Sequence, residues 1–405
     1  MPCYPLTFHC LSRKNFVFRL PLLSPFATFA AKKQNMKTQK LTQIVIQGYR
    51  SISFDHPVRL DIGSINILLG ANGAGKSNII SFFKMVGYMI SGSLQQYVAQ
   101  SGTNQKFLHY GSKKTPTLCA AIRFDDDTSY AMYRFSLTTA VPNKLIISSE
   151  TIERKTKPDE SPVSRILSSD FNESALVKAT DTDCRLVGDF LSGCKVYQFS
   201  DSSLSAPMRQ ASTVESAHYL QSEANNLASF LYYLKNNYTD AYNRIVDYVQ
   251  GVVPQFKDFY LEPEHGYISL KWIDTSLNDY VLSADQFSDG SIRFISLATL
   301  LLQPEETMPS VIIIDEPELG LHPYAVDQLT EMIKDASKHV QVIIATQSPS
   351  IIDGFRADDV LIIERDENLQ CSTVKKLNAE DYKDWLDHYT LSELWDKNIL
   401  GGRPV

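Results

Sequence analysis

The sequence predicts an α/β fold, in which a mostly parallel core sheet carries an antiparallel β subdomain and an inserted helical lobe. In the last third of the chain, the apolar strands "VIIID", "QVIIAT" and "DVLIIER" alternate with helical segments. Continuously apolar strands that alternate with helices are typical of parallel sheets covered on both faces. Earlier in the chain, "AAIRF" and "YAMYRFSL" flank "DDDTS", which indicates an antiparallel hairpin.

The spacing of apolar residues predicts the individual elements. The segments "LTQIVIQGYRSI", "VRLDI" and "INILLG" are predicted strands near the start of the domain. Residues 76–90, 223–252 and 323–339 have the composition and apolar spacing of helices. We expect "KLIISSETIERK" to extend the antiparallel sheet, and "YISLKWI" and "DYVLSA" to form a further hairpin.

These elements predict a single domain over residues 36–405. The core would consist of residues 36–90 and 280–405, the antiparallel β subdomain of residues 116–155, and the helical lobe of residues 186–260. Residues 1–35 contain an apolar stretch that is interrupted by Arg19 and two prolines, and Met36 then opens a segment typical of a natural N-terminus. We expect residues 1–35 to be a non-native or disordered extension, with an export signal as the alternative.

Composition narrows the class of protein. The 405 residues carry a formal net charge of −7, which argues against a general electrostatic footprint for nucleic acid. No apolar run is long enough to cross a membrane. The six cysteines include no C-x-x-C pair, which favours reduced thiols over a zinc site or disulfides. We therefore expect a cytoplasmic protein that does not act in a membrane.

The stretch "INILLGANGAGKSNII" contains the full pattern G-x-x-x-x-G-K-[ST] between a predicted strand and a predicted helix. Its glycines let successive backbone N–H groups turn inward around phosphate, and the helix N-terminus adds a favourable dipole. Lys76 would reach the β and γ phosphates of ATP, and Ser77 would ligate Mg²⁺. The predicted ATP-binding residues of this P-loop are Gly70, Asn72, Gly73, Ala74, Gly75, Lys76, Ser77 and Asn78.

A second motif, "VIIIDEPELGLHP", places two carboxylates at the end of an apolar strand. Ligands of open α/β sheets bind at the carboxyl ends of the strands. Asp315 would hold Mg²⁺, directly or through water, and Glu316 would polarise the attacking water as general base. The alternative interpretation is an ordinary acidic strand end without a role in ligand binding. The P-loop in the same chain favours the role in a nucleotide site over this alternative.

Two further segments carry weaker signals. "QFSDGSIRF" contains a Ser-x-Gly turn, formed by Ser288 and Gly290, that opens a helix and is either an anion-binding site or a simple helix cap. "IIATQSP" puts Gln347 at a strand tip, where it would touch the γ-phosphate or merely end the strand.

The order of these motifs resembles the ATP-binding-cassette ATPases, in particular the branch with RecF, the SMC proteins and the OLD-type nucleases. Within that branch the chain is similar to bacterial AAA-type predicted ATPases. The matching phrases are "GYRSI", "GANGAGKS", "VYQFSD", "FSDGSIRF", "IIIDEPELGLHP", "ATQSPSIIDGF" and "LSELWDKNILGGRP". The resemblance implies the fold of a P-loop NTPase with an ABC-ATPase-like head.

The resemblance also implies how the site is completed. In such cassettes the Ser-x-Gly element acts on ATP held by a second subunit. Ser288 and Gly290 of one chain would therefore contact ATP bound to the other chain, in a homodimer that encloses two ATP molecules. Residues 320–322 would lie in the loop at this interface. Gln347 occupies the position of a γ-phosphate-sensing histidine, which is a departure because glutamine does not titrate near neutral pH. Gln198 is the candidate for the glutamine that senses Mg²⁺.

The role of "GYRSI" has two interpretations: Tyr49 or Arg50 contacts the nucleotide, or Tyr49 simply packs in the core. The leading hypothesis for function is an ATP-driven dimeric switch in bacterial anti-phage defence, which acts with a separate effector such as a nuclease or toxin. The first alternative is a RecF-like DNA maintenance ATPase, and the second is an ATP-binding scaffold with little turnover. Candidate basic positions for nucleic acid are Lys106, Lys113, Lys114, Arg154, Lys155 and Lys157.

Overall fold

The structure is a computed structural model, and it describes residues 39–126, 129–156, 160–167, 172–275 and 280–403. These residues belong to one compact unit, Thr38–Val405. The predicted extension over residues 1–35 and the basic position Lys157 lie outside the described residues. No helix in the described ranges is both long and apolar enough to span a membrane.

The core sheet has six strands in the order β17-β16-β3-β15-β14-β8. The strands β3, β15, β14, β8 and β16 run parallel, and β17 pairs antiparallel with β16. The mostly parallel core sheet predicted from the sequence is therefore confirmed. The bounds of these strands are β3 Ile65–Leu69, β8 Cys194–Tyr197, β14 Val311–Asp315, β15 Gln341–Thr346, β16 Val360–Asp366 and β17 Cys371–Lys376.

The second large sheet is antiparallel, with the order β2-β1-β4-β5-β6-β7. Its centre is the predicted hairpin, in which β4 pairs with β5 and β5 with β6. β1 and β2 come directly before β3 in the chain but join this sheet, because β1 buries one face only and lacks the continuous apolar pattern of a core strand. The bounds are β1 Lys40–Gln47, β2 Val58–Asp61, β4 Thr117–Asp125, β5 Tyr130–Ala140, β6 Lys144–Lys155 and β7 Val163–Ile166.

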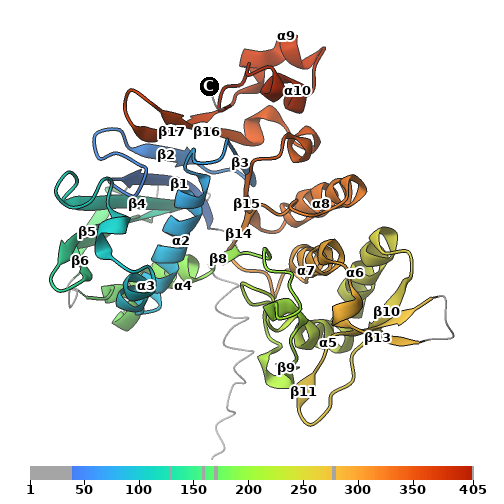
Figure 1. Cartoon of the computed structure of the whole chain (residues 1–405). Helices are drawn as coiled ribbons and strands as arrows, with labels where there is room; N and C mark the ends of the chain where they lie inside the picture. Colours follow the sequence, from blue (N-terminus) through green and yellow to red (C-terminus); the bar gives the residue numbers. More distant parts are fainter. Residues whose placement is uncertain (1–38, 127–128, 157–159, 168–171, 276–279, 404–405) are drawn as a thin grey trace, which may run out of the picture. The chain divides into compact units, whose positions relative to one another are not determined.

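Helix α2, Lys76–Ile90, lies between the two large sheets (Figure 1). Its apolar face packs with the antiparallel sheet and with one face of the core sheet, including Leu68, Ile313 and Ala345. Alternate residues of the same strands, such as Ile67 and Ile314, pack on the opposite face. The core strands are therefore covered on both sides, as their apolar pattern predicts.

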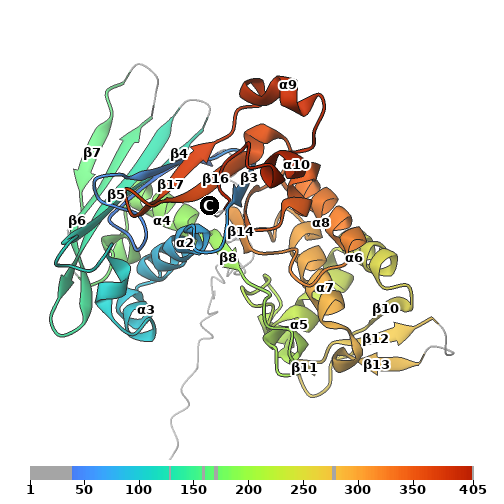
Figure 2. The ribbon, with the colours of Figure 1, turned by 45° about the horizontal axis from the view of Figure 1, so that its top comes forward.

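The opposite face of the core sheet is covered by helices that pack against each other in the order α5, α6, α7 and α8. Figure 2 shows these helices together with a small antiparallel sheet of order β10-β12-β13. The single helix predicted over residues 223–252 is two helices, because Tyr238 leaves helical geometry between them. The bounds are α5 Leu227–Asn237, α6 Thr239–Val252, α7 Asp289–Leu302, α8 Pro323–Ala336, β10 Phe256–Tyr260, β12 Lys271–Asp274 and β13 Val281–Ser283.

Cys194–Tyr197 forms the edge strand β8 of the core sheet, inside the range expected to form the helical lobe. The segment is too short for its periodicity to reveal a strand. The predicted bounds of the core, the β subdomain and the helical lobe stay predictions. Strand β8 lies within the range predicted for the helical lobe but belongs to the core sheet. The remaining α-helices and strands are α3 Leu94–Gln100, α4 Thr182–Ser192, β9 Ser212–Thr213, β11 Tyr267–Ile268, α9 Lys383–Leu386 and α10 Leu391–Asp396.

Candidate functional site

The P-loop follows β3, and its last residues, from Lys76 on, form the first turn of α2, as predicted. Gly73 and Gly75 have φ angles of 81° and 122°, which side-chain-bearing residues rarely adopt. Gly70 is needed for a different reason, since a Cβ there would lie 2.4 Å from the carbonyl oxygen of Ile363 on β16. The glycines at these positions therefore permit the tight turn that the predicted phosphate nest requires.

The Lys76 side chain is buried at the start of α2, where its ammonium group donates to the backbone carbonyls of Gly70 at 2.6 Å and Ala71 at 3.0 Å. Burial lowers the pKa of this ammonium group, and the nearby carboxylates Glu316, Asp315 and Glu318 raise it. The amine is thus held inside the loop and within electrostatic reach of the carboxylates. This arrangement brings the two predicted motifs into one site.

A chain of hydroxyl groups supports the P-loop from behind. The Ser372 hydroxyl of β17 donates to the carbonyl of Ala74 at 2.5 Å, and the Ser51 hydroxyl, 2.7 Å away, donates to Ser372 because each hydroxyl carries one proton. Asn78 donates its side-chain amide to the same Ser51 hydroxyl at 2.6 Å. A Cβ on Gly75 would approach the Ser372 hydroxyl to 2.2 Å, so this contact needs glycine. The predicted residue Asn78 therefore has a structural role in fixing the loop.

The predicted carboxylates end strand β14 beside β15. Asp315 pairs with Ala345, and the backbone N–H of Glu316 donates to the carbonyl of Ala345 at 2.8 Å. Glu316 has a φ of 47°, a left-handed conformation that is unusual for a residue other than glycine or asparagine. Such strained positions are frequent at functional sites, which fits the role predicted for Glu316.

Two carboxyl groups of this turn have perturbed acidity. Burial raises the pKa of Asp315, and Glu316 raises it further, while Lys84 and Lys76 lower it. Burial also raises the pKa of Glu318, whose carboxylate accepts a hydrogen bond from the Thr346 hydroxyl. The second carboxylate oxygen of Glu318, Oε2, is buried without a hydrogen-bond partner. Perturbed acids that cluster in one place favour a functional site.

Gln198 directly follows β8, whose Tyr197 pairs with Ile314 of β14. The parallel register therefore places Gln198 next to Asp315 at the carboxyl edge of the sheet. Its side-chain oxygen accepts a hydrogen bond from the ammonium group of Lys84 at 2.8 Å. The structure thus brings Gln198 to the side of the site where a metal-sensing glutamine is expected.

The residues present fit a magnesium ion, which prefers oxygen ligands and usually keeps several waters. The exposed hydroxyl of Ser77, the carboxylate of Asp315 and the amide oxygen of Gln198 are oxygen donors of this kind. In the described part of the chain, no group of three or more His, Cys, Asp or Glu side chains forms a denser metal site. Magnesium held here with ATP would neutralise charge on the phosphate oxygens.

Ser288 is the N-cap of α7, and its hydroxyl accepts the backbone N–H of Ser291 at 3.1 Å. Gly290 packs closely against the next motif, since a Cβ there would lie 2.7 Å from the carbonyl oxygen of Gly320. Within the described ranges, no recorded hydrogen bond joins Ser288 or Gly290 to the P-loop of the same chain. The capped-helix interpretation is thus correct for the isolated chain, and the role in a second subunit stays a prediction.

Two arginines hold this turn in place. The buried Arg209 donates to the carbonyls of Ser202 at 3.1 Å and Phe287 at 3.1 Å, and forms an ion pair with Asp289. Arg293 of α7 donates to the carbonyl of Leu319 at 2.7 Å. The Ser-x-Gly turn and residues 319–320 are therefore fixed to each other as one surface element.

Gln347 follows β15 as predicted and is half-buried. Its neighbour Ser348 donates a backbone hydrogen bond to the Thr346 hydroxyl at 2.9 Å. Since that hydroxyl itself donates to Glu318, the strand tip that bears Gln347 is linked to the acidic turn.

In the "GYRSI" segment the core-packing interpretation of Tyr49 is confirmed, and a nucleotide contact by Arg50 stays a prediction. Tyr49 is fully buried, stacks edge-on against Phe82 and bonds to the hydroxyl of Ser81 at 2.9 Å, so it packs in the core. Arg50 instead lines a cavity beside Asn78. Of the candidate basic positions, Arg154 forms an ion pair with Asp183 and Lys114 lies 4.9 Å from the ring centre of Tyr110.

The chain is similar to known proteins in sequence and in fold. A sequence profile of the family described as "AAA domain, putative AbiEii toxin, Type IV TA system" matches residues 65–353, which is more than half of the chain. The chain belongs to this family. The matched span contains the P-loop, the Ser-x-Gly turn, the acidic turn and Gln347.

Curated relatives match a shorter segment. The energy-coupling factor transporter ATP-binding protein EcfA2 of Lactobacillus delbrueckii subsp. bulgaricus is 28% identical over 137 residues, which cover 33% of this chain and 45% of the relative. The protein of the same name from Ligilactobacillus salivarius is 28% identical over 121 residues, which cover 29% of this chain and 39% of the relative. The match spans less than half the length of these relatives.

Solved structures show the same fold over most of the chain. An Smc head bound to the C-terminal winged-helix domain of ScpA has a TM-score of 0.54 at 15% identity, with 85% of this chain and 99% of that chain covered. The Smc head domain with an extended coiled coil from Pyrococcus furiosus, bound to the C-terminal domain of ScpA, has a TM-score of 0.52 at 13% identity, with coverage of 86% and 99%. The predicted ABC-ATPase-like head is confirmed, and family and fold together make this chain a P-loop ATPase domain.

Three residues of the site were not predicted from the sequence. Lys84 and Ser372 reach the site through contacts between distant segments, and no local sequence motif marks them as site residues. Glu318 did carry a signal, since it is a further acid within the same "DEPEL" motif. Its burial distinguishes it from an ordinary solvated acid of a turn.

Proposed function

We propose that this protein binds ATP with Mg²⁺ and that two copies close around two ATP molecules to form a molecular switch. The observation that carries this proposal is the separation of the site into two surfaces. The P-loop and the acidic turn form one surface, and Ser288, Gly290 and Gly320 form the other, with no recorded hydrogen bond between Ser288 or Gly290 and the P-loop in the described chain. A twofold arrangement of two chains would complete both sites at once.

In this proposal each residue has a defined task. Lys76 leaves the carbonyls of Gly70 and Ala71 to contact the β and γ phosphates, and Ser77 and Asp315 hold Mg²⁺. Glu316 accepts a proton from the attacking water as general base. Gln347 orients the γ-phosphate or this water through its amide, and it contributes no charge because the amide does not titrate. The Ser288 hydroxyl and the N–H groups of the α7 N-terminus meet the γ-phosphate of the partner's ATP.

The biological setting is part of the same proposal. The family description names a toxin of a Type IV toxin–antitoxin system, which supports a role in bacterial defence. We propose that the switch acts through a separate effector protein, such as a nuclease or toxin, that binds either the closed or the open dimer. ATP binding would then change the state of the effector, and hydrolysis would reset it.

The proposal is tested with Glu316→Gln, which removes the base but keeps the shape of the side chain. Light scattering after gel filtration with Mg²⁺ and ATP should show twice the 45.6-kDa mass of the chain. Lys76→Ala should stay monomeric, and Glu316→Gln with Ser288→Arg should bind ATP without forming the dimer. A Glu316→Gln protein that remains monomeric at saturating ATP refutes the proposed enclosure.

The effector is tested separately. The Glu316→Gln protein, purified from its native host with ATP, should retain a protein that is absent when Lys76→Ala is used as bait. Identical sets of retained proteins for both variants would exclude an effector that senses the nucleotide state.

A further inference from the structure

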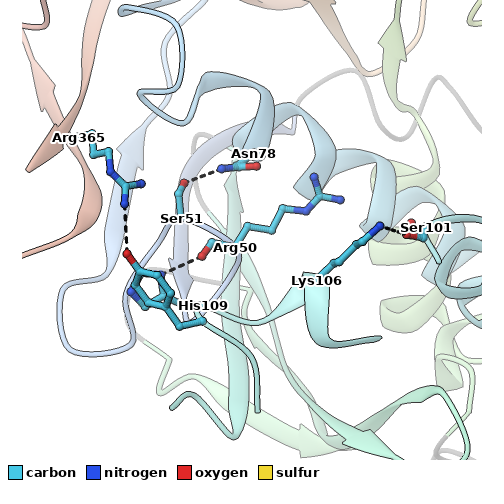
Figure 3. Close-up of a pocket in the computed structure, with 8 residues that line it drawn as sticks. Arg50, Ser51, Asn78, Ser101, Lys106, His109 and Arg365 are labelled. Atoms are coloured by element: carbon cyan, nitrogen blue, oxygen red, sulfur yellow. Dashed lines mark hydrogen bonds between the residues drawn. The ribbon is translucent and has the colours of Figure 1, made fainter. Parts of the chain in front are cut away.

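A cavity of about 550 Å³ lies on the flank of the P-loop helix (Figure 3). It is formed where the loop after β1, the first turn of α2, the segment between α3 and β4, and the end of β16 meet. The residues that line it are Arg50, Ser51, Asn78, Ser101, Lys106, His109, Tyr110 and Arg365. The cavity is thus assembled from four segments that are distant in sequence.

The lining contains three permanent cations and no carboxylate. Lys106 donates to the carbonyl of Ser101 at 3.2 Å, and Arg365 donates to the hydroxyl of Tyr110 at 3.2 Å (Figure 3). Both of these acceptors are neutral. Arg50 lies over the rings of Tyr49 and Phe107, and its Nε is buried without a hydrogen-bond partner.

This charge pattern is costly without an anion. Like charges that lie close together repel each other, with water screening the exposed Lys106 and Arg365 in part, and a buried donor without an acceptor loses its hydration. In the described part of the chain, no ion pair with an acidic side chain is recorded for Arg50, Lys106 or Arg365. A bound anion would remove the repulsion and supply the missing acceptor.

The cavity is held in shape before any ligand binds. The backbone N–H of Arg50 donates to the carbonyl of Phe107 at 3.1 Å, and that of His109 donates to the carbonyl of Gly48 at 3.1 Å. The His109 ring nitrogen Nδ1 lies 2.8 Å from the carbonyl of Arg50, which requires this nitrogen to be the donor. The two cationic segments are therefore fixed against each other.

We propose that this cavity is a phosphate-binding site in addition to the P-loop. Guanidinium and ammonium groups form short, charge-assisted hydrogen bonds with phosphate oxygens, and arginine matches their geometry with two donors. The phosphate has two possible sources: a further phosphate group of the same nucleotide that Lys76 holds, or a separate phosphorylated ligand. The chemistry of recognition is the same for both.

The cavity is connected to the P-loop. Asn78 lines it and donates to Ser51, which also lines it and is hydrogen-bonded to Ser372. Ser372 in turn donates to the carbonyl of Ala74 inside the P-loop. A ligand that moves Ser51 or Asn78 therefore acts on the loop that holds the triphosphate. This site does not depend on the proposed dimer.

The test uses the full chain with Lys76→Ala, so that the P-loop binds anions poorly, and inorganic pyrophosphate as the probe in calorimetric titrations. Adding Lys106→Ala and Arg365→Ala should weaken binding of pyrophosphate by about tenfold or more, because two charge-assisted contacts are lost. The matched control is Lys113→Ala, an exposed lysine of the same segment that does not line the cavity. Lys106→Arg with Arg365→Lys keeps both charges and should restore most of the affinity.

Equal binding in the cavity variant and in the Lys113→Ala control overturns the proposal. Thermal unfolding of each variant shows whether the fold is kept. If the variant with Lys106→Ala and Arg365→Ala unfolds, the variant with Lys106→Arg and Arg365→Lys still tests whether the two charges bind pyrophosphate.

A second titration identifies the source of the phosphate. If Glu316→Gln loaded with Mg²⁺ and ATP still binds pyrophosphate through Lys106 and Arg365, the ligand is a separate molecule. If ATP excludes pyrophosphate, and the cavity variant also binds ATP about tenfold more weakly than the control, the nucleotide itself reaches the cavity.

Discussion

The ammonium group of Lys84 donates a hydrogen bond to the side-chain oxygen of Gln198 at 2.8 Å. Lys84 lies two turns along α2 from the P-loop, and Gln198 follows β8 at the carboxyl edge of the core sheet. The charge of Lys84 also lowers the pKa of Asp315. A protein cation therefore occupies the neighbourhood in which Mg²⁺ is expected.

We predict that Lys84→Met tightens binding of Mg²⁺. Removing a positive charge near Asp315 removes its repulsion of the metal, and the freed Gln198 oxygen becomes available as a ligand. The Mg²⁺ concentration that half-saturates the ATP complex should fall by roughly three- to tenfold, as expected for one partly screened charge. Fluorescent ATP analogues titrated with Mg²⁺ measure this value. Lys84→Arg keeps the charge and should behave as wild type; weaker Mg²⁺ binding by Lys84→Met would instead show that Lys84 positions Gln198 for the metal.

The close contact of Gly290 with Gly320 predicts the effect of Gly290→Ala. The added Cβ would lie 2.7 Å from a backbone oxygen, so residues 319–320 must move away from the α7 N-terminus. We expect the ATP-dependent dimer of the Glu316→Gln protein to weaken by about tenfold, since this surface faces the partner in the proposed dimer. ATP binding to the single chain should change by less than about twofold, because no P-loop contact is altered.

Gly87→Ala is the matched control for this change. Gly87 lies inside α2, and a Cβ there meets nothing within 4 Å. Alanine at such a helical position stabilises by about 0.5–1 kcal/mol relative to glycine. Sedimentation velocity of both variants with ATP makes the comparison, and equal dimerisation of the two would contradict a role for the Gly290 contact.

The buried carboxyl of Glu318 predicts how stability depends on pH. Burial raises its pKa above the ordinary value of 4.5, so the folded protein holds the proton more tightly than the unfolded chain. The free energy of unfolding should therefore fall as pH rises from about 4.5 through the raised pKa, and then stay level. Glu318→Gln cannot ionise and should be more stable than wild type above this range, with a difference that shrinks as the pH is lowered. Urea unfolding at several pH values tests this, with the exposed Glu367→Gln as a control that should show no such trend.

Much of the fold and of the site follows from local sequence. Helix α2 begins and ends where the apolar spacing places it, and the P-loop residues lie as the motif predicts. Both features depend on neighbours in sequence, so a pattern within a short window is sufficient. The same is true of the hairpin formed by β4 and β5, where alternation and a polar turn coincide.

Features that depend on contacts between distant segments could not be predicted from a pattern within a short window of sequence. The four residues of β8 belong to the core sheet because they pair with β14, and the hydrogen bond from Ser372 to the carbonyl of Ala74 joins residues 298 positions apart. The break at Tyr238 divides a continuous helical pattern, so composition favoured one helix where the chain forms two. For β8 and Ser372, contacts between distant segments, and not local preference, decide the structure.

The buried guanidinium of Arg209 is the basis of a last prediction. It donates to the carbonyls of Ser202, Ala284 and Phe287, and these bonds fix the turn that leads into α7. Arg209→Met should leave the carbonyl groups without donors and should lower the free energy of unfolding by about 2–4 kcal/mol. It should also weaken the ATP-dependent dimer, because Ser288 is the N-cap of the same helix.

Arg244→Met is the control for Arg209→Met. Arg244 is half-exposed and pairs with Asp335 at 2.5 Å, and such surface pairs contribute less than about 1 kcal/mol. Urea unfolding compares the stability of the two variants, and light scattering with ATP compares their dimers. A loss for Arg209→Met that is no larger than the loss for Arg244→Met would show that the turn before α7 keeps its shape without the buried arginine.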